Sequence, residues 1–248
     1  MTTKTIVLIV LIVAAAIIEC IFAPLFSVAQ RPGKSARSRL YKMICATMFL
    51  LIGVLAFILS GNESVFARLM LIGLGFSWVG DLFLHLNGKV CFSIGFASFA
   101  TAHIWYLCAY YNATKMYFPE RKFITVIEVI IILVIMIATA LFLTLVKKMS
   151  IKSPGMIASL AYGFVLIPMT VKAAAFSLDF IMGGYPHAVI SGAMLAFGAI
   201  AFFLSDVSLS ILMFNKPDKD NYKLKDFNVA TYFIGQTLLA LTILFIGI

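Results

Sequence analysis

Charged residues are scarce in this sequence. Only 12% of the 248 residues are Asp, Glu, Lys or Arg, and 63% are hydrophobic. Soluble domains carry roughly 25% charged and about 45–50% apolar residues. The shortage excludes a soluble domain of any size, because too few polar side chains remain to cover its surface. The mean hydropathy of +1.09 leads to the same conclusion.

Cysteine and histidine are also rare, which disfavours disulfide and metal chemistry. The cysteines show no paired spacing, and we interpret them as packing residues rather than as disulfides or metal ligands. The histidines fall at different depths of separate apolar segments, which disfavours a three-histidine zinc site. We therefore expect no metal and no other cofactor. The residues concerned are Cys20, Cys45, Cys91, Cys108, His85, His103 and His187.

Long apolar runs are abundant, and each is long enough to cross a hydrocarbon core of about 30 Å. They lack the alternation of barrel strands, and backbone polar groups in lipid must be satisfied within a segment, so we expect helices. The first run exceeds the apolar region of a signal peptide and is interpreted as a helix. The predicted fold is an all-α, polytopic membrane helical bundle forming one integral membrane domain, 1–248. The eight expected spans are 5–28, 40–60, 65–86, 91–111, 123–146, 154–179, 187–214 and 227–248.

The distribution of basic residues predicts the orientation in the membrane. Short loops rich in Lys and Arg stay in the cytoplasm, and most basic residues follow the odd-numbered spans, as in the segment 29–42. Both termini should therefore lie on the non-cytoplasmic side. This asymmetry explains the net charge of +9 without a nucleic-acid partner, and the lipid bilayer, including its anionic head groups, is the expected partner.

Two aspartates interrupt the apolar runs. Asp81 lies in GLGFSWVGDLFLHL (73–86), and Asp206 lies in GAIAFFLSDVSLSIL (198–212). An ionisable side chain at membrane depth costs roughly 2.5–3.5 kcal/mol on insertion scales, so both should face the bundle interior or a wet cavity. Each aspartate follows a small residue, Gly80 or Ser205, that allows close approach. The matched settings favour one shared site over two separate interhelical hydrogen bonds.

The two aspartate segments also suggest an internal repeat. A shift of 125 positions aligns Gly73 with Gly198 and Asp81 with Asp206. Two parallel halves, 1–121 and 122–248, would place both aspartates at one depth near a pseudo-twofold axis along the membrane normal.

Further polar residues at similar depth are candidates for binding substrate. His85 shares a helix face with Asp81, and His103 lies one turn before Tyr106. Each histidine has an alternative structural role, at the interface or in an interhelical hydrogen bond. We interpret Lys172 as structural. The substrate-binding candidates are Tyr162, Tyr232, Gln236, His103, His85 and Glu19, whereas Asp179, Asp218, Asp220 and Asp226 are expected to be solvated in loops.

Four segments together resemble the YhhN family of multi-pass membrane proteins, to which lysoplasmalogenases belong. The likeness is clear in the third, fourth, seventh and eighth spans and weaker around Tyr162; the first two spans add little beyond hydrophobicity. It implies eight helices, a lysophospholipid substrate, and hydrolysis of the vinyl ether bond of lysoplasmalogens to a fatty aldehyde and a glycerophospho-alcohol. The segments are GLGFSWVGDLFL, GFASFATAHIWY (95–106), SDVSLSILMF (205–214) and ATYFIGQTLLA (230–240).

The two aspartates suit this implied reaction as catalytic residues. Protonation of the β-carbon of a vinyl ether gives an oxocarbenium ion, to which water adds. Glycosidases solve a related problem with two carboxylates in unlike environments. Trp78 and Phe83 are near Asp81 in the sequence and are expected to desolvate it, so Asp81 is the first choice for the acid and Asp206 for the base.

Other functions use the same residue pattern. A transporter would carry protons or cations on the two carboxylates; strong repeat symmetry would favour that function, whereas asymmetry and a lateral opening for lipid would favour an enzyme. A lipid-binding module without activity is a third possibility. An intramembrane aspartyl protease is disfavoured, because Trp78 stands where its G-x-G-D motif needs glycine and no tyrosine precedes Asp206. The sequence does not predict the oligomeric state.

Overall fold

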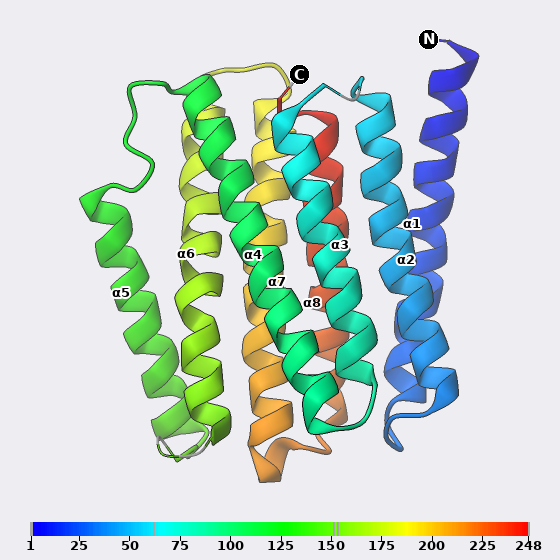
Figure 1. Cartoon of the computed structure of the whole chain (residues 1–248), viewed down its shortest axis with the longest axis vertical. Helices are drawn as coiled ribbons and strands as arrows, with labels where there is room; N and C mark the ends of the chain where they lie inside the picture. Colours follow the sequence, from blue (N-terminus) through cyan, green and yellow to red (C-terminus); the bar gives the residue numbers. More distant parts are fainter. Residues whose placement is uncertain (1, 62, 151, 153, 248) are drawn as a thin grey trace.

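In the part of the chain that the structure describes, eight helices are long and apolar enough to cross a membrane, and they form a bundle whose two termini lie at the same end (Figure 1). This computed structural model describes residues 2–61, 63–150, 152 and 154–247. The helices are α1 (Thr3–Ala29), α2 (Ala36–Leu59), α3 (Val65–His85), α4 (Lys89–Tyr117), α5 (Val126–Leu141), α6 (Pro154–Met182), α7 (Ala188–Phe214) and α8 (Tyr222–Leu241). A π-helix (Phe142–Val146) continues α5, and short 3-10 helices (Lys216–Asp218 and Thr242–Leu244) lie before and after α8. The predicted all-α membrane bundle is confirmed.

The helices extend beyond several of the predicted spans, because polar residues lengthen them past the apolar stretch. Helix α4 continues to Tyr117 instead of ending at 111, and α8 begins at Tyr222 instead of 227. The side chain of Asn221 caps α8 by accepting a hydrogen bond from the backbone N–H of Leu224. A capped polar turn of this kind remains helical at the interface, where hydropathy alone predicts a loop.

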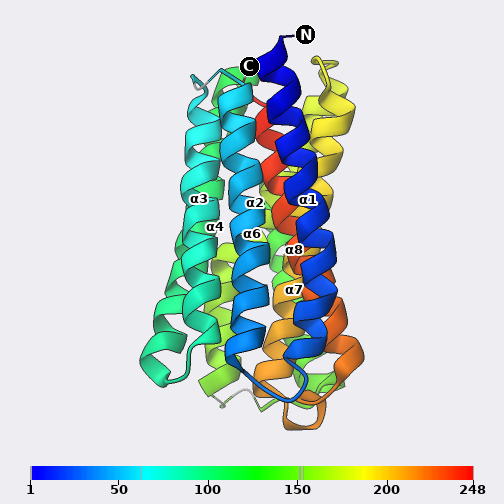
Figure 2. The same ribbon diagram turned by 90° about the vertical axis from the view of Figure 1, so that its right-hand side faces the viewer.

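Most neighbours in sequence pack as antiparallel pairs, such as α1 with α2, α3 with α4 and α7 with α8, and α8 also packs against α1, α2 and α3 (Figures 1 and 2). Helix α5 lies at the edge of the bundle and packs mainly on α6. Most of its side chains are exposed, and only Glu128 is buried. In a membrane these exposed apolar side chains would face lipid, so α5 contributes little to the protein core.

A buried group of charges joins α5 to α6 at the end of the bundle that carries the termini. Lys172 Nζ lies 3.1 Å from Glu128 Oε1, which confirms the structural role expected for this lysine. Arg121 lies 3.4 Å from the same oxygen and also pairs with Asp179. Asp179 therefore stands in the last turns of α6 with its side chain only 14% exposed, and its prediction as a solvated loop residue was wrong.

Two more aspartates expected to be solvated are paired instead. Asp226 lies inside α8, where it accepts a hydrogen bond from Ser27 and pairs with Arg31 at 3.1 Å. Asp218 is 3.1 Å from Lys147 Nζ, and the Lys147 hydrogen bond lowers the pKa of this carboxyl below its ordinary value. The prediction of solvation was wrong for Asp218, whose side chain is 19% exposed, because Lys147 turns back to contact its carboxylate. Asp226 lies in a helix rather than in a loop, but its side chain stays 45% exposed beside Arg31. Asp220, 81% exposed, is solvated as expected.

Glycines bring α7 and α8 together. A methyl group on Gly235 would lie 2.9 Å from the carbonyl oxygen of Gly198 and 3.0 Å from the backbone nitrogen of Phe202. Backbone atoms of a neighbouring helix cannot move aside as a flexible side chain can. Small residues allow such close helix contact in membranes, and this contact fixes the position of α8 beside Asp206.

We therefore expect Gly235→Ala to destabilise the protein by about 1–3 kcal/mol, the usual cost of overpacking. Gly75→Ala is the matched control, because a methyl group there meets no atom within 4 Å. Thermal unfolding of both variants in detergent would measure the difference. Equal melting temperatures would contradict the tight contact between α7 and α8.

The orientation predicted from the basic residues can be tested by cysteine labelling of intact cells. Pro32 is exposed in the loop between α1 and α2, and Glu120 is exposed beyond α4 at the opposite end. In a chain whose native cysteines are replaced by alanine, an impermeant maleimide should label Glu120→Cys and should not label Pro32→Cys. The reverse pattern would invert the orientation.

Candidate active site

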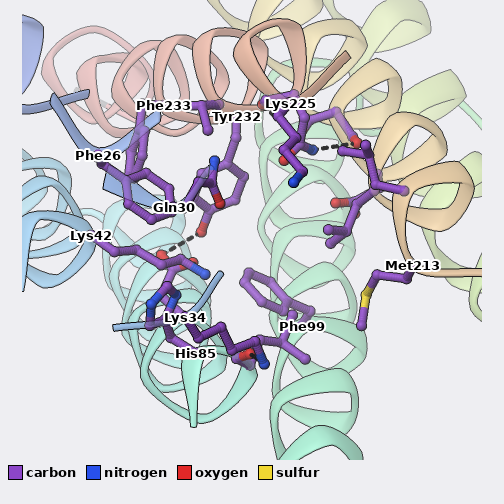
Figure 3. Close-up of a pocket in the computed structure, with 18 of the residues that line it drawn as sticks. Phe26, Gln30, Lys34, Lys42, His85, Phe99, Met213, Lys225, Tyr232 and Phe233 are labelled. Carbon is purple, nitrogen blue, oxygen red and sulfur yellow. Dashed lines mark hydrogen bonds and ion pairs between the residues drawn. The ribbon is translucent and has the colours of Figure 1, made fainter. Parts of the chain in front are cut away.

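Both intramembrane aspartates line one cavity of about 360 Å³, here called the central cavity (Figure 3). Its walls come from α1, α2, α3, α4, α7 and α8, and it reaches loop residues Gly33 and Lys219 at the end of the bundle opposite the termini. Asp81 is one turn from the end of α3, whereas Asp206 lies two turns from the end of α7. The cavity therefore connects the two buried carboxylates with the loop side of the bundle.

Asp81 is held through both of its carboxylate oxygens. Its side chain is 1% exposed, and Oδ1 lies 3.0 Å from the ammonium of Lys42 on α2. Oδ2 accepts a hydrogen bond of 2.7 Å from the hydroxyl of Tyr232 on α8. Gln236, one turn further along α8, donates to the same hydroxyl oxygen at 3.3 Å. These partners fix the direction in which the carboxylate points.

Asp206 has a different set of partners, drawn from α4 and α6. Its Oδ2 accepts a hydrogen bond of 2.6 Å from the hydroxyl of Tyr162. The Nε2 atom of His103 lies 2.6 Å from that hydroxyl and 3.7 Å from the carboxylate oxygen. A hydroxyl has one proton to donate, so while Tyr162 donates to Asp206, His103 donates to Tyr162. The three side chains form a continuous chain of polar groups.

Lys42 is the site residue that sequence reasoning missed. It was counted only among the basic residues that orient the chain, because it lies near the beginning of a span. Its long apolar stem allows the ammonium to reach inward from α2 toward Asp81. The signal was indirect: a carboxylate that is buried at membrane depth needs a cationic or hydrogen-bonding partner.

The remaining candidates divide between the cavity and its surroundings. His85 lines the central cavity, and its Nε2 contacts the Ser38 hydroxyl at 2.8 Å. Glu19 is buried outside the cavity lining, where one oxygen accepts from Thr237 at 2.6 Å and the other has no partner among the described residues. The structure therefore places His85 at the site and Glu19 apart from it.

The surroundings of the two aspartates are not symmetric, and the predicted repeat is not confirmed. Lys42 and Tyr232 reach Asp81 from α2 and α8. The position that the 125-residue shift pairs with Lys42 is Ile167, which cannot provide a charge.

Among the described residues, no group of three or more His, Cys, Asp or Glu side chains is arranged to hold a metal ion.

A small apolar recess of about 30 Å³ adjoins Asp206 between α4, α6 and α7, and is here called the side groove. Phe92, Phe96 and Phe214 contribute to its walls, and Met213, 40% exposed, lies at the outer surface of the bundle. Asp206 and Phe99 line both the side groove and the central cavity. The side groove therefore places apolar side chains between the outer surface of the bundle and Asp206, and its free space is about the size of one water molecule.

Comparison with protein families identified a match over residues 39–243 to the YhhN family. The chain belongs to the YhhN family. The matched region contains both aspartates and Lys42, whereas α1 lies outside it. Searches of curated proteins and of solved structures gave no match. The resemblance seen in the four sequence segments is thus confirmed at the level of the family.

The ion pair in this YhhN-family chain can be tested through stability. Removing one partner of a buried ion pair costs about 3–5 kcal/mol, because the other charge remains buried and unpaired. We therefore expect Lys42→Met to lower the melting temperature in detergent, and Lys42→Met combined with Asp81→Asn to recover much of the loss. Losses that add in the double variant would show that the two side chains act independently.

Proposed function

We propose that the protein is a membrane-embedded hydrolase that cleaves the vinyl ether bond of lysoplasmalogens by acid–base catalysis with Asp81 and Asp206. The family contains lysoplasmalogenases, and this likeness supplies the substrate class. The single observation that supports it most directly is the central cavity, which two carboxylates with unlike partners line together. Unlike environments are what an acid and a base require at one site.

The contacts favour Asp206 as the acid and Asp81 as the carboxylate. The sequence favoured the reverse, because Trp78 was expected to desolvate Asp81. In the structure the indole of Trp78 instead donates a hydrogen bond to Thr47 at 3.2 Å, and Asp81 is paired with the ammonium of Lys42. An adjacent cation favours the charged form of a carboxylate. Asp206 has no ammonium or guanidinium partner among the described residues, and its direct contacts are the Tyr162 hydroxyl and the His103 ring.

The proposed reaction begins and ends with the same protonation states. Asp206 protonates the β-carbon of the vinyl ether and becomes a carboxylate, which stabilises the oxocarbenium ion. Water adds to the α-carbon and gives its proton to Asp81. In the resulting hemiacetal, Asp206 takes the hydroxyl proton while Asp81 protonates the departing glycerol oxygen. The aldehyde and the alcohol are released, and no other reactant is consumed.

The hydrogen-bond partners have positioning roles in this scheme. Tyr232 and Gln236 hold Asp81 in place on the cavity wall. Tyr162 connects Asp206 to His103, a path along which a proton can be redistributed between turnovers. The phenylalanines of the side groove provide apolar contacts for the hydrocarbon chain of a lipid that enters sideways from the bilayer, and such entry requires these side chains to move apart, because the groove has only about 30 Å³ of free space.

Two features favour an enzyme over the alternative function of a proton- or cation-coupled transporter. The two aspartates have dissimilar partners, and the core beyond them is filled with large side chains. Tyr232 packs against Phe99 and Phe202, and His103 and Tyr106 beyond them are fully buried. A transporter needs access to its site from both sides of the membrane, whereas a hydrolase of membrane lipid needs access from one.

We expect Asp81→Asn and Asp206→Asn each to reduce aldehyde release at least 100-fold, since a general acid or base contributes roughly 10²–10⁴-fold. The purified variants would be assayed in detergent on choline and ethanolamine lysoplasmalogens, with aldehyde measured by coupled reduction. Glu120→Gln, which removes a carboxylate exposed outside the cavity, should retain wild-type turnover.

Normal turnover by either asparagine variant would give that carboxylate a structural role. If the wild-type protein releases no aldehyde, the hydrolase proposal fails. Ion-coupled flux into liposomes, lost in the same variants, would then identify a transporter.

A further inference from the structure

The loop end of the central cavity is rich in lysine. Lys34, Lys42, Lys219 and Lys225 line it, and Figure 3 shows Lys34 and Lys42 on one side with Lys225 across from them. The carboxylates that line the cavity are Asp81 and Asp206. Because Lys42 is paired with Asp81, the three further ammonium groups around the opening outnumber the one carboxylate of the cavity that remains, Asp206.

These three ammonium groups retain capacity to bind an anion. Among the described residues, the Lys219 ammonium has no hydrogen-bond or ion-pair partner. Lys225, whose side chain is 16% exposed, lies 3.7 Å from Asp220, whose side chain is 81% exposed. A long ion pair with an exposed partner contributes little, so it would not prevent a ligand anion from binding between Lys219 and Lys225.

Lys34 is held at the rim by backbone groups. Its ammonium donates to the carbonyl oxygens of Leu84 at 2.6 Å and Leu86 at 3.2 Å, at the end of α3. A lysine ammonium has three protons to donate, so one remains for a ligand. Burial lowers the pKa of Lys34, and the nearby charge of Lys42 lowers it further. A bound anion would offset this repulsion between the two cations.

We propose that Lys34, Lys219 and Lys225 bind the phosphate group of a single-chain phospholipid at the mouth of the central cavity. The identity of the lipid chain rests on the proposed function. Lysine is a compact point charge suited to phosphate oxygens, and the apolar side chains of Phe99 and Met213, which line both the central cavity and the side groove, offer contacts to a hydrocarbon chain. A ligand with both parts fits better than a soluble anion does.

The depth of the carboxylates agrees with this placement. Asp81 lies four residues inside the end of α3, which corresponds to about 6 Å along a helix axis. In a lysoplasmalogen, the three glycerol carbons separate the phosphate from the vinyl ether oxygen. A phosphate at the lysines thus leaves the reactive bond to extend inward toward the aspartates.

The test compares two non-hydrolysable lipids that differ only in the phosphate. One is 1-O-hexadecyl-glycero-3-phosphate and the other is 1-O-hexadecylglycerol; both have a saturated ether in place of the vinyl ether. Their dissociation constants would be measured for the full-length protein in detergent. We expect Lys219→Gln combined with Lys225→Gln to weaken binding of the phosphate lipid roughly tenfold or more, and to leave binding of the phosphate-free lipid unchanged.

The matched control is Lys216→Gln combined with Lys223→Gln, which makes the same change in net charge. Both of these lysines are exposed and lie outside the lining of the central cavity. Wild-type binding of both lipids by this control would separate a specific phosphate site from general attraction to positive charge. An equal loss in the control would overturn the proposal.

Three other results would overturn it as well. The first is wild-type affinity of the Lys219 and Lys225 double variant for the phosphate lipid. The second is an equal loss for both lipids. The third is binding of glycerol 3-phosphate as tightly as the phosphate lipid, which would assign the site to a soluble phosphate. None of these measurements depends on turnover, so absence of aldehyde release would refute the hydrolase while leaving the phosphate site intact.

Discussion

The structure of this site depends on one constraint: a carboxylate buried in a membrane bundle needs partners from other helices. Asp81 lies on α3, but its partners Lys42 and Tyr232 come from α2 and α8. An unpaired carboxylate there would be costly, because few polar atoms and no bulk solvent replace its hydration. The need of Asp81 for an ammonium and a hydroxyl partner thus favours the packing of α2 and α8 beside α3. The glycine contact between α7 and α8 also holds α8 in this position.

The difference between the two aspartates has chemical consequences. Both follow a small residue in an apolar helix, and the sequence offered only the neighbours of Asp81 as a means to distinguish them. Asp81 is paired with an ammonium group, whereas Asp206 is connected to a hydroxyl and an imidazole. Two carboxylates in identical surroundings would have the same intrinsic proton affinity, whereas unlike partners give them different proton affinities. This asymmetry is the physical basis for assigning an acid and a base to the proposed hydrolysis.

The cavity also joins two environments that an amphiphilic substrate needs. Lysines surround its loop end, and phenylalanines line the groove that adjoins Asp206. A lipid with one chain and a phosphate group could extend between these regions and place its ether bond at the carboxylates. The same lysines that predicted orientation from the sequence therefore have a second role in the proposed substrate binding. Charge at the membrane interface can direct both topology and ligand recognition.

The sequence by itself determined the fold class, the eight spans and the two aspartates, because hydropathy and the cost of buried charge are local properties of the chain. Only the tertiary structure decided the partners. Lys42 was read as a loop cation, Asp179 and Asp218 were read as solvated, and Trp78 was expected beside Asp81; each depends on contacts between residues distant in sequence. Spacing along a helix predicts its inward face, whereas the residue that meets this face depends on how the helices pack.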